Sequence, residues 1–445
     1  MLNVHLDFIA YTPEAYVDTI MSYIMAGVRR LRFRPFNRFA QAVASELSSR
    51  FNDLCFYADP TETDLPSEVH PYHPDVCVDL TLFCENDAEL LSTQLLDYLD
   101  CDRGIWVAPI TRYYFKSRPL FLISVPKGGT HLLYEFVETL GYARGFACPL
   151  TPVPGVTYFL QDEHSHTRAT DFLRDVPWHA PFANSHHPFV RSPALFIYRN
   201  PLDILISEAN WYHQDGKNVF AGYFSDLSFE ERQLKLIEDP WLLGSIRDRV
   251  GAFIAWFHMP NVIPISFEEI VGPQGGGDAL HQLRLLWSLQ LKLHVPGTPA
   301  TFADKVFNPN SPTFHAGQIG TYKTKLTPQA REKFLTLPQD FMEAYGFDSP
   351  DVANPVAISR HAERFRKRPL KFSAVDHSSS PIMLESGFME HNLVQYQGRV
   401  FGLPHSLGAF DLTQAPPGRL ATLLQGRDLN EIKVKVLKSP ACRAY

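Results

Sequence analysis

Cysteine is scarce in this sequence, with six residues in a chain of 445. No two of them form a C-x-x-C pair, and they are too few for a disulfide framework, so we expect free thiols in a reducing compartment. The sequence also lacks any apolar run approaching the roughly 18 residues that cross a bilayer. Its first residues show no basic segment followed by an apolar stretch, as a signal peptide would. These absences predict a cytoplasmic protein without a membrane span.

An excess of positive charge is missing as well. Lys and Arg number 41 against 48 Asp and Glu, and the resulting net charge of −7 argues against a nucleic-acid partner. The basic stretches Arg29–Arg34 and Arg360–Lys371 are interpreted as solvated helix faces or linker. Hydrophobic residues make up 45% and charged residues 20% of the chain, as in ordinary soluble globular proteins. The length allows two or three domains.

The first region, residues 1–115, alternates strand-like and helical patterns and predicts a small α/β unit. The expected strands are "HLDFIAY", "DVCVDLTLFC" and "GIWVAPI". The stretch "DAELLSTQLLDYL" predicts a helix, and "ADPTETDLPSEVHPYHPDV", rich in Pro and Asp, predicts a loop. We assign no role to this region from its sequence.

A second region, residues 116–365, contains the short all-apolar runs "LFLISV", "ALFIY" and "NVIPIS", each followed by a helical pattern. Such runs are typical of parallel strands that are covered on both faces. In residues 366–445, "FSAVDHSSSPI" predicts a linker and "NLVQYQGRVFGLP" a hairpin around Gln397 and Gly398. The expected fold class is therefore α/β, with a central parallel sheet flanked by helices and a small β-containing region at the C-terminal end.

The first apolar run of the second region leads into "PKGGTHLL", where Lys127, Gly128, Gly129 and Thr130 stand between a strand and a helix. Glycines let backbone amides approach an anion closely, and a helix N-terminus adds free N–H groups. A lysine and a threonine hydroxyl complete a phosphate cradle. The order G-x-x-x-x-G-K-[ST] is absent and no Ser or Thr follows the lysine to hold magnesium, which disfavours a metal-dependent kinase or ATPase. A plain strand–helix turn is the alternative.

The second apolar run leads into "YRNPLDILIS", with Arg199 at the carboxyl end of a predicted parallel strand. Ligands of open α/β sheets bind at such ends. Pro201 suits the first position of a helix, and Ser207, about two turns further on, can approach the same ligand. Asp203 is expected to brace the turn. A capped helix start with a surface ion pair is the alternative interpretation.

These two segments resemble motifs of the sulfotransferases that use 3′-phosphoadenosine 5′-phosphosulfate (PAPS). The first resembles P-K-S-G-T-[TS]-W, the loop that holds the 5′-phosphosulfate. Four residues match, namely Pro126, Lys127, Gly129 and Thr130. Gly128 replaces the usual serine and His131 the second hydroxyl residue. The second segment resembles R-N-P-x-D-x-x-x-S at every fixed position, which implies that Arg199 and Ser207 hold the 3′-phosphate.

A third segment, "FHAGQIGTYK", resembles the family's late motif F-R-K-G-x-x-G-D-W-K. Phe314, Gly317, Gly320 and Lys323 match, whereas His315 and Ala316 replace the basic pair. The resemblance implies a loop that closes over the nucleotide and contacts its 3′-phosphate through His315 and Gly317. The "VIPISFEEI" run resembles the strand that precedes this loop. The segments follow one another in the family's order across about 200 residues.

Sulfuryl transfer needs charge stabilisation on the leaving phosphate and removal of a proton from the acceptor. The resemblance implies that Lys127 supplies the first. For the second, "NSHHP" resembles the Lys-Thr-His-Leu-Pro segment that carries the family's base, and it aligns His186 with that histidine. His131 and Glu135 remain alternative bases. The pair His164 and His166 lacks a third ligand, so no metal site is expected.

The expected acceptor is a hydroxyl of a saccharide or of another small molecule. Aromatic residues make up 13% of the chain, and "NWYHQ" and "RYYF" suit stacking against a sugar or an aryl ring equally. Two other functions stay open, a P-loop kinase-like phosphotransferase and a catalytically weakened nucleotide-binding protein of the same fold. The flanking regions are open to acceptor binding, self-association or a separate activity.

Overall fold

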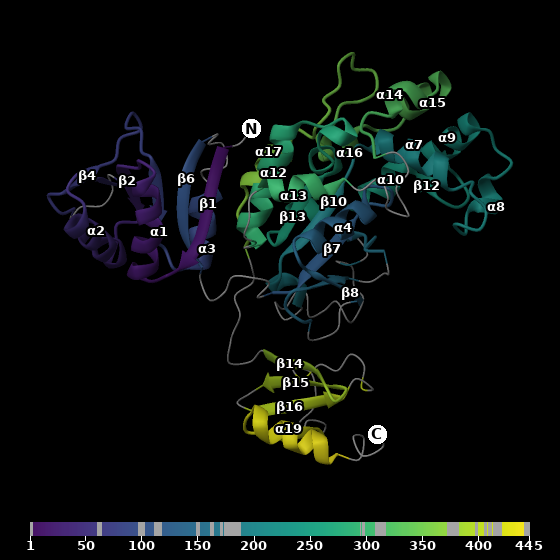
Figure 1. Cartoon of the computed structure of the whole chain (residues 1–445). Coiled ribbons are helices and arrows are strands. Elements are labelled where there is room, and N and C mark those ends of the chain that lie inside the picture. Colours follow the sequence, from purple (N-terminus) through teal and green to yellow (C-terminus); the bar gives the residue numbers. More distant parts are fainter. Residues whose placement is uncertain are drawn as a thin grey trace. The chain divides into compact units, whose positions relative to one another are not determined.

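Figure 1 shows the computed structural model of the chain, which describes the residues in the following ranges. They are residues 3–59, 65–96, 103–110, 118–147, 152–160, 164–169, 172, 188–293, 295, 299–307, 317–371, 382–396, 399–404, 407, 412 and 421–439. The chain divides into two compact units. The first comprises residues 1–117, 269–311 and 363–369, and the second comprises 118–268, 312–362 and 370–445. Residues 269–311 thus group with the N-terminal region, whereas the sequence-based boundaries at 115 and 365 stay a prediction.

The first unit is built on a six-stranded parallel sheet. Its strands are, in spatial order, β1 (Asn3–Ala10), β6 (Arg103–Ile110), β5 (Leu80–Phe83), β2 (Arg30–Arg34), β3 (Cys55–Ala58) and β4 (Val69–Pro71). The helices that alternate with them are α1 (Pro13–Met25), α2 (Arg38–Arg50) and α3 (Ala88–Leu96). The strands expected in "HLDFIAY" and "GIWVAPI" and the helix in "DAELLSTQLLDYL" are therefore confirmed, while only the last part of "DVCVDLTLFC" forms a strand.

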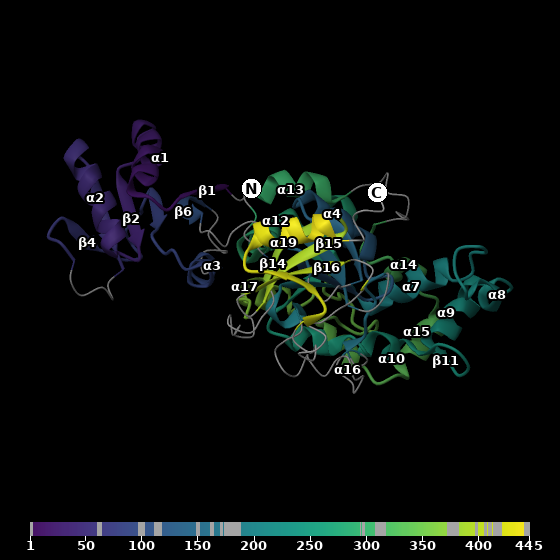
Figure 2. The ribbon, with the colours of Figure 1, turned by 90° about the horizontal axis from the view of Figure 1, so that it is seen from below.

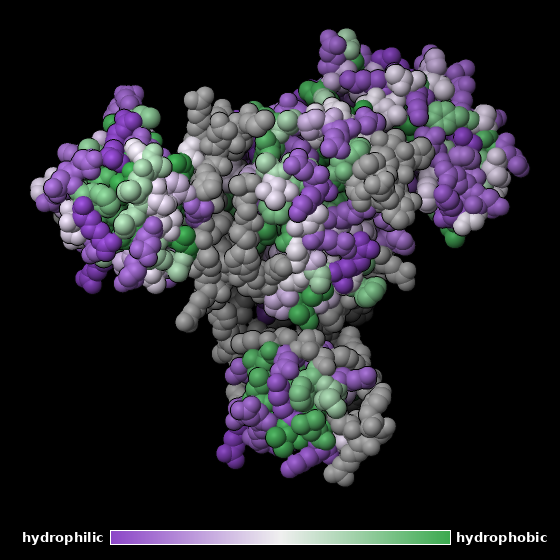
Figure 3. Space-filling model, viewed as in Figure 1, coloured by the Kyte–Doolittle hydropathy of each residue, from purple (hydrophilic) through white to green (hydrophobic). Residues whose placement is uncertain are grey.

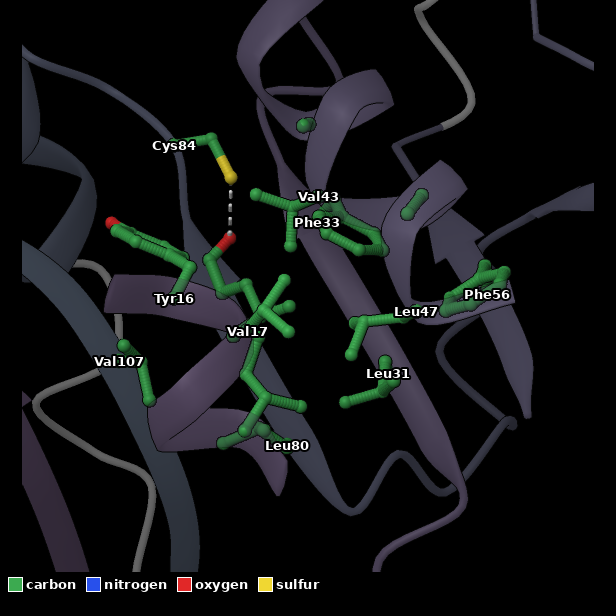
Figure 4. Packing of buried hydrophobic residues seen from close by; sticks show 14 of the residues in the cluster. Tyr16, Val17, Leu31, Phe33, Val43, Leu47, Phe56, Leu80, Cys84 and Val107 are labelled. Carbon is green, nitrogen blue, oxygen red and sulfur yellow. Dashed lines mark hydrogen bonds between the residues drawn. The ribbon is translucent and has the colours of Figure 1, made fainter. Parts of the chain in front are cut away.

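The core of this unit lies between helices α1 and α2 and the sheet, as Figure 4 shows. Tyr16 and Val17 of α1 and Val43 and Leu47 of α2 are buried against strand residues. Those strand residues include Leu31, Phe33, Phe56, Leu80 and Val107. The loop expected around residues 58–76 is wrong in part, because β4 lies within it. Val69 is buried in the core, but a strand of three residues is too short to produce a recognisable alternation.

Residues 269–311 and 363–369 add helices to the first unit. They are α12 (Ala279–Leu293), α13 (Pro299–Val306) and most of α17 (Ala362–Lys367), with the short helix η4 (Pro273–Gly275). Trp287 of α12 stacks on Trp106 of β6 with ring centroids 4.7 Å apart. Arg366 forms a buried ion pair with Glu269. The tryptophan pair ties α12 to the N-terminal sheet, and the ion pair ties the 363–369 segment to the start of the 269–311 segment.

The second unit contains a five-stranded parallel sheet. In spatial order its strands are β13 (Val262–Ser266), β10 (Ala194–Tyr198), β7 (Leu120–Ser124), β9 (Val156–Phe159) and β8 (Ala143–Ala147). Every residue of β7, β10 and β13 is buried, which explains their continuous apolar runs. The three strands expected from these runs are confirmed.

Helices and short turns accompany this sheet, and Figure 1 shows several of them extending to one side of it. The longer ones are α4 (Thr130–Thr139), α7 (Pro201–Trp211), α9 (Phe229–Ile237) and α15 (Pro328–Leu335). The shorter ones are α8 (Ala221–Phe224), α10 (Ile246–Gly251), α11 (Phe267–Ile270), α14 (Tyr322–Lys325), α16 (Asp340–Tyr345), η2 (Pro188–Arg191) and η3 (Ile254–His258). A small hairpin, β11 (Glu238–Asp239) and β12 (Gly244–Ser245), links α9 to α10.

The C-terminal residues form an antiparallel sheet of four strands. The strands are β14 (Ile382–Phe388), β15 (His391–Tyr396), β16 (Arg399–Pro404) and β17 (Leu424–Gly426), and helix α19 (Leu429–Lys438) packs on one face of the sheet. Figure 2 shows α19 lying across the strands. The hairpin expected from "NLVQYQGRVFGLP" is confirmed by the pairing of β15 with β16, although its turn at 397–398 and the linker expected at 372–381 lie outside the described residues.

The predicted fold class is confirmed, since parallel sheets flanked by helices are joined to a small antiparallel sheet. On the face in Figure 3, hydrophilic residues cover much of the described surface and apolar residues occur in small groups. Within the described segments, every helix is too short or too polar to cross a membrane.

Candidate functional site

The candidate site lies at one edge of the five-stranded sheet. Strand β10 is paired in parallel with β7 on one side and β13 on the other, with Ile197 opposite Ser124 and Tyr198 opposite Ser266. The pairing extends one residue past β7, because the amide of Val125 donates to the carbonyl of Ile197 at 3.2 Å. The loops after the three strands therefore meet at the same carboxyl edge, where parallel sheets bind their ligands.

The loop after β7 is tightly wound. Lys127 has a φ of 62° and Gly129 a φ of 112°, both in the left-handed region, and the amide of Gly128 donates to the carbonyl of Val125 at 2.8 Å. A Cβ on Gly128 would lie 2.8 Å from that carbonyl oxygen, and one on Gly129 would lie 2.8 Å from the ring of Phe267. A side chain at either position would therefore require the loop or its neighbours to shift.

Helix α4 starts directly from this loop. Its N-cap residue is Gly129, and no side chain caps the helix. The first-turn N–H groups of a helix have no intrahelical partner, and together they carry a partial positive charge. With Pro126 half-buried before Lys127, the loop thus presents uncapped amides and one cation, the chemistry that seats a phosphate or sulfate.

The ammonium of Lys127 lies over an aromatic ring. Its Nζ is 4.1 Å from the ring centroid of Trp211, the last residue of α7. No described residue forms a hydrogen bond with this Nζ. Burial lowers the pKa of Lys127 to about 8, and Arg199 acts in the same direction, whereas Glu208 opposes the shift. The lysine is thus mostly charged at neutral pH, and it loses its proton about one pH unit above neutrality.

Arg199 follows β10 and is only 9% exposed. Its Nη2 donates to the carbonyl of Gln318 at 2.7 Å, and its guanidinium lies 4.2 Å from the ring centroid of Phe267. Its Nε is buried and has no hydrogen-bond partner in the described part of the chain. A buried donor left without an acceptor costs about 1–3 kcal/mol, so this side of the guanidinium is suited to an anion.

Asp203 lies in the first turn of α7 and supports the glycine-containing loop at 317–322. The sequence predicted only that it would brace the turn at the start of its own helix. The carboxylate of Asp203 accepts from the amides of Gly320 at 2.7 Å and Tyr322 at 3.0 Å. Gly317 and Gly320 have φ values of 59° and 68° and allow the tight bend. The loop at 317–322 is consequently held beside Arg199, whose Nη2 donates to the carbonyl of Gln318.

A buried carboxylate also supports the turn after β10. Glu268 accepts from the amide of Asn200 at 2.8 Å and from the hydroxyl of Ser266 at 2.6 Å. The side chain of Asn200 in turn caps α7 by accepting from Leu202. Burial raises the pKa of Glu268 to about 7 against these hydrogen bonds. This carboxylate fixes the backbone that carries Arg199.

A network of hydroxyl and imidazole groups lies next to the loop at 126–130, and the sequence did not predict it. The hydroxyl of Thr130 lies 2.7 Å from that of Ser124 and 3.1 Å from Nε2 of His166. Ser165 lies within 3.3 Å of Ser124 and Tyr134, oxygen to oxygen. The only sequence signal was the "HSH" run itself, whose place beside Thr130 depends on contacts 36 residues apart.

The remaining predicted residues fall into two groups. His131 is exposed at the start of α4, where partial desolvation and Lys127 lower its pKa, and Glu135 lies one turn further on. Ser207 is half-buried on α7, and no described residue hydrogen-bonds to its side chain. His186 and His315 lie outside the described residues, so the expected base and the expected late-loop contact have no structural description.

A scan of protein-family models finds no match for this chain, and a search of curated proteins finds none either. Among solved structures, the chain is similar to the crystal structure of mouse sulfotransferase SULT7A1 complexed with PAP. The sequence identity is 17% and the TM-score is 0.37. The similarity covers 56% of this chain and 88% of that chain.

Replacing Asp203 by Ala should loosen the late loop. Two hydrogen bonds to a buried carboxylate are lost, at a cost of about 2–4 kcal/mol in the free energy of unfolding. Lys323 and Lys325 are exposed next to the loop, so trypsin should cleave after them faster in Asp203→Ala. The exposed Asp215→Ala variant is the control. Equal cleavage rates in all three proteins would contradict the bracing role.

Replacing Glu268 by Gln should change how stability depends on pH. Between 4.5 and about 7 the folded protein holds a proton that the unfolded chain has released. The free energy of unfolding therefore falls as the pH rises through this window. Glu268→Gln cannot titrate, so urea unfolding at pH 5 and 8 should show its stability, relative to the native chain, rising by up to ~3 kcal/mol. The exposed Glu332→Gln variant is the control, and a pH dependence identical to the native chain in Glu268→Gln would disprove the assignment.

Proposed function

We propose that this protein is a PAPS-dependent sulfotransferase that moves a sulfuryl group to a hydroxyl of a saccharide or small-molecule acceptor. The observation that carries the proposal is the meeting of two cationic loops at one sheet edge. Lys127 and Arg199 follow adjacent parallel strands, and the backbone of the first loop is hydrogen-bonded to the end of the second strand. The ring of Phe267 lies next to both loops, because it contacts the guanidinium of Arg199 and occupies the space that a side chain at Gly129 would need.

The residues present fit a donor with an anion at each end. Nε of Arg199 is a buried donor without an acceptor among the described residues, and an arginine fork suits a phosphate. The uncapped start of α4 and the ammonium of Lys127 suit a second anionic group. We assign the first position, with Ser207, His315 and Gly317, to the 3′-phosphate and residues 126–131 to the 5′-phosphosulfate. Bound there, PAPS would supply the sulfuryl group.

In this proposal Lys127 stabilises negative charge at the leaving side, and no metal is invoked because the cation and the amides supply the positive charge. The protein must also take a proton from the acceptor hydroxyl. His186 remains the proposed base, with His131 and Glu135 as alternatives. The lowered pKa of His131 keeps its imidazole neutral near pH 7, the form that accepts a proton.

The test is calorimetric titration with 3′-phosphoadenosine 5′-phosphate and with adenosine 5′-phosphate, both without magnesium. We expect the 3′-phosphate to improve affinity roughly 10- to 100-fold in the native chain, the range of hydrogen bonds to charged groups. Arg199→Ala should abolish this difference between the two nucleotides. Lys127→Ala should weaken both by a similar factor and preserve the difference. ATP binding that requires magnesium would favour a P-loop kinase-like enzyme instead.

Catalysis is tested with labelled PAPS against a panel of saccharide and small-molecule hydroxyls. Transfer should occur with the native chain and be slowed at least roughly 100-fold, but still measurably, in Lys127→Ala, whose fold is checked by circular dichroism. Full activity in Lys127→Ala would refute the site assignment. Nucleotide binding with no transfer to any acceptor would favour the weakened, non-catalytic binding protein.

Nucleotide affinity should fall as Lys127 loses its proton. Its pKa of about 8 means that the free protein is mostly neutral at this position at pH 9, while the bound anion favours the charged form. Binding therefore takes up a proton, and the affinity for 3′-phosphoadenosine 5′-phosphate should decrease roughly tenfold between pH 7 and 9. Lys127→Arg, which stays charged, should show a nearly flat profile. A flat profile in the native chain would contradict the prediction.

A further inference from the structure

Trp211 is the aromatic residue whose ring contacts the ammonium group of Lys127. The Nζ of Lys127 is 4.1 Å from its ring centroid, well within the range of a cation–π contact. The Nζ of Lys217 lies 5.4 Å from the same centroid. No described residue offers the Lys127 ammonium a hydrogen bond. The indole face is thus the principal contact of this cation.

The position of Trp211 is fixed by its helix and not by the phosphate loop. Glu208 lies one turn earlier on α7, and its carboxylate accepts a hydrogen bond from Nη2 of Arg249 at 2.6 Å. The Nη2 atom of Arg249 also donates to the carbonyl of Leu236 at 2.8 Å. The carbonyl of Trp211 accepts from the side chain of Asn218 at 3.1 Å. The end of α7 is therefore anchored independently of whether a ligand fills the loop.

A lysine in this loop needs such a restraint. Its four-carbon stem is flexible, and ordering it costs up to about 2 kcal/mol of rotamer entropy. The neighbouring position cannot supply a side chain to hold it, because a Cβ on Gly128 would collide with the carbonyl of Val125. A cation–π contact of about 0.5–2 kcal/mol can offset much of this cost.

The contact also leaves the lysine charge available. Both carboxylate oxygens of Glu208 are already engaged, one by Arg249 and the other by the hydroxyl of Tyr212 at 3.3 Å. Glu208 attracts the ammonium electrostatically, while Arg199 repels it and His131 lies near enough to interact with it. An aromatic face holds a cation without neutralising it, so an arriving anion meets the full charge.

We infer that Trp211 is a positioning residue whose indole face holds the Lys127 ammonium at the mouth of the phosphate loop, ready for the anionic donor. The consequence for transfer rests on the proposed function, but the contact itself can be tested on the protein without any nucleotide. Two variants of similar size separate the aromatic face from simple bulk, Trp211→Phe and Trp211→Leu.

The first experiment measures how fast each lysine is acetylated by trace acetic anhydride between pH 7 and 10, with peptide mass spectrometry as readout. The exposed Lys323 and Lys325 are internal references. Relative to them, Lys127 should react several-fold faster in Trp211→Leu than in the native chain and nearly at the native rate in Trp211→Phe. Equal relative rates in Trp211→Leu and the native chain, or equal acceleration in both variants, would overturn the inference.

If Trp211→Leu does not fold, the reciprocal variant keeps the test decisive. In protein labelled with 5-fluorotryptophan, the resonance of Trp211 is identified as the one missing from Trp211→Phe. Lys127→Met should shift this resonance and leave those of buried Trp256 and Trp287 in place. An unmoved Trp211 resonance would show that the two side chains are not coupled.

The second experiment is a double-mutant cycle on sulfuryl transfer. Trp211→Leu should lower kcat at least tenfold while the Kd for 3′-phosphoadenosine 5′-phosphate changes less than threefold. In a Lys127→Ala background the same substitution should change kcat less than twofold, since its target is gone. If the two substitutions lowered kcat independently, so that their factors multiplied in the double variant, Trp211 would act on the acceptor or on the fold and not through Lys127. Absence of transfer in the native chain would end the proposed function, and the acetylation result would still decide the role of Trp211.

Discussion

The parallel pairing of β7 with β10 is the constraint on which the site depends. It brings Ser124 opposite Ile197 and continues into the loop through the hydrogen bond from Val125. Two segments separated by about 70 residues in the chain thereby reach the same sheet edge at the same height. A shift of one residue along this pair would move Lys127 away from Arg199 and would turn buried apolar side chains of both strands toward the wrong face.

Behind the two cations, carboxylates are buried but none of them neutralises a cation fully. Asp203 binds two amides of the late loop, Glu268 binds an amide and a serine hydroxyl, and Glu208 binds Arg249 and Tyr212. Asp203 also lies at the edge of ion-pair distance from Arg199, with Oδ2 4.0 Å from Nη2. The hydrogen bonds of the three carboxylates otherwise go to groups other than Lys127 and Arg199. The site is consequently rigid before a ligand arrives, and its positive groups keep unused bonding capacity.

The sequence predicted the parts of this arrangement that are encoded locally. The apolar runs of β7, β10 and β13 report burial on both faces, and the glycines and Pro201 mark the turns that follow. It placed the "NWYHQ" run beside the site as a stacking surface for the acceptor, but it did not predict that Trp211 contacts Lys127 or that His166 contacts Thr130. Those contacts depend on how α7 and the 164–169 segment pack against the loop, which no local period records. The short strands β2, β3, β4, β8 and β9 were missed because three to five residues carry too little pattern. The interpretation of Arg29–Arg34 as a solvated helix face or linker is therefore wrong, because β2 runs through it with Leu31 and Phe33 buried.

Phe267 gives the site a further property. Its ring lies against the guanidinium of Arg199 on one side of the site and closes the space at Gly129 on the other. A single uncharged ring therefore lies between Arg199 and the loop at Gly129, and it carries no group that titrates with pH. In the proposed function this ring sets the spacing between the two anion positions, so that donors are selected by the distance between their charged groups.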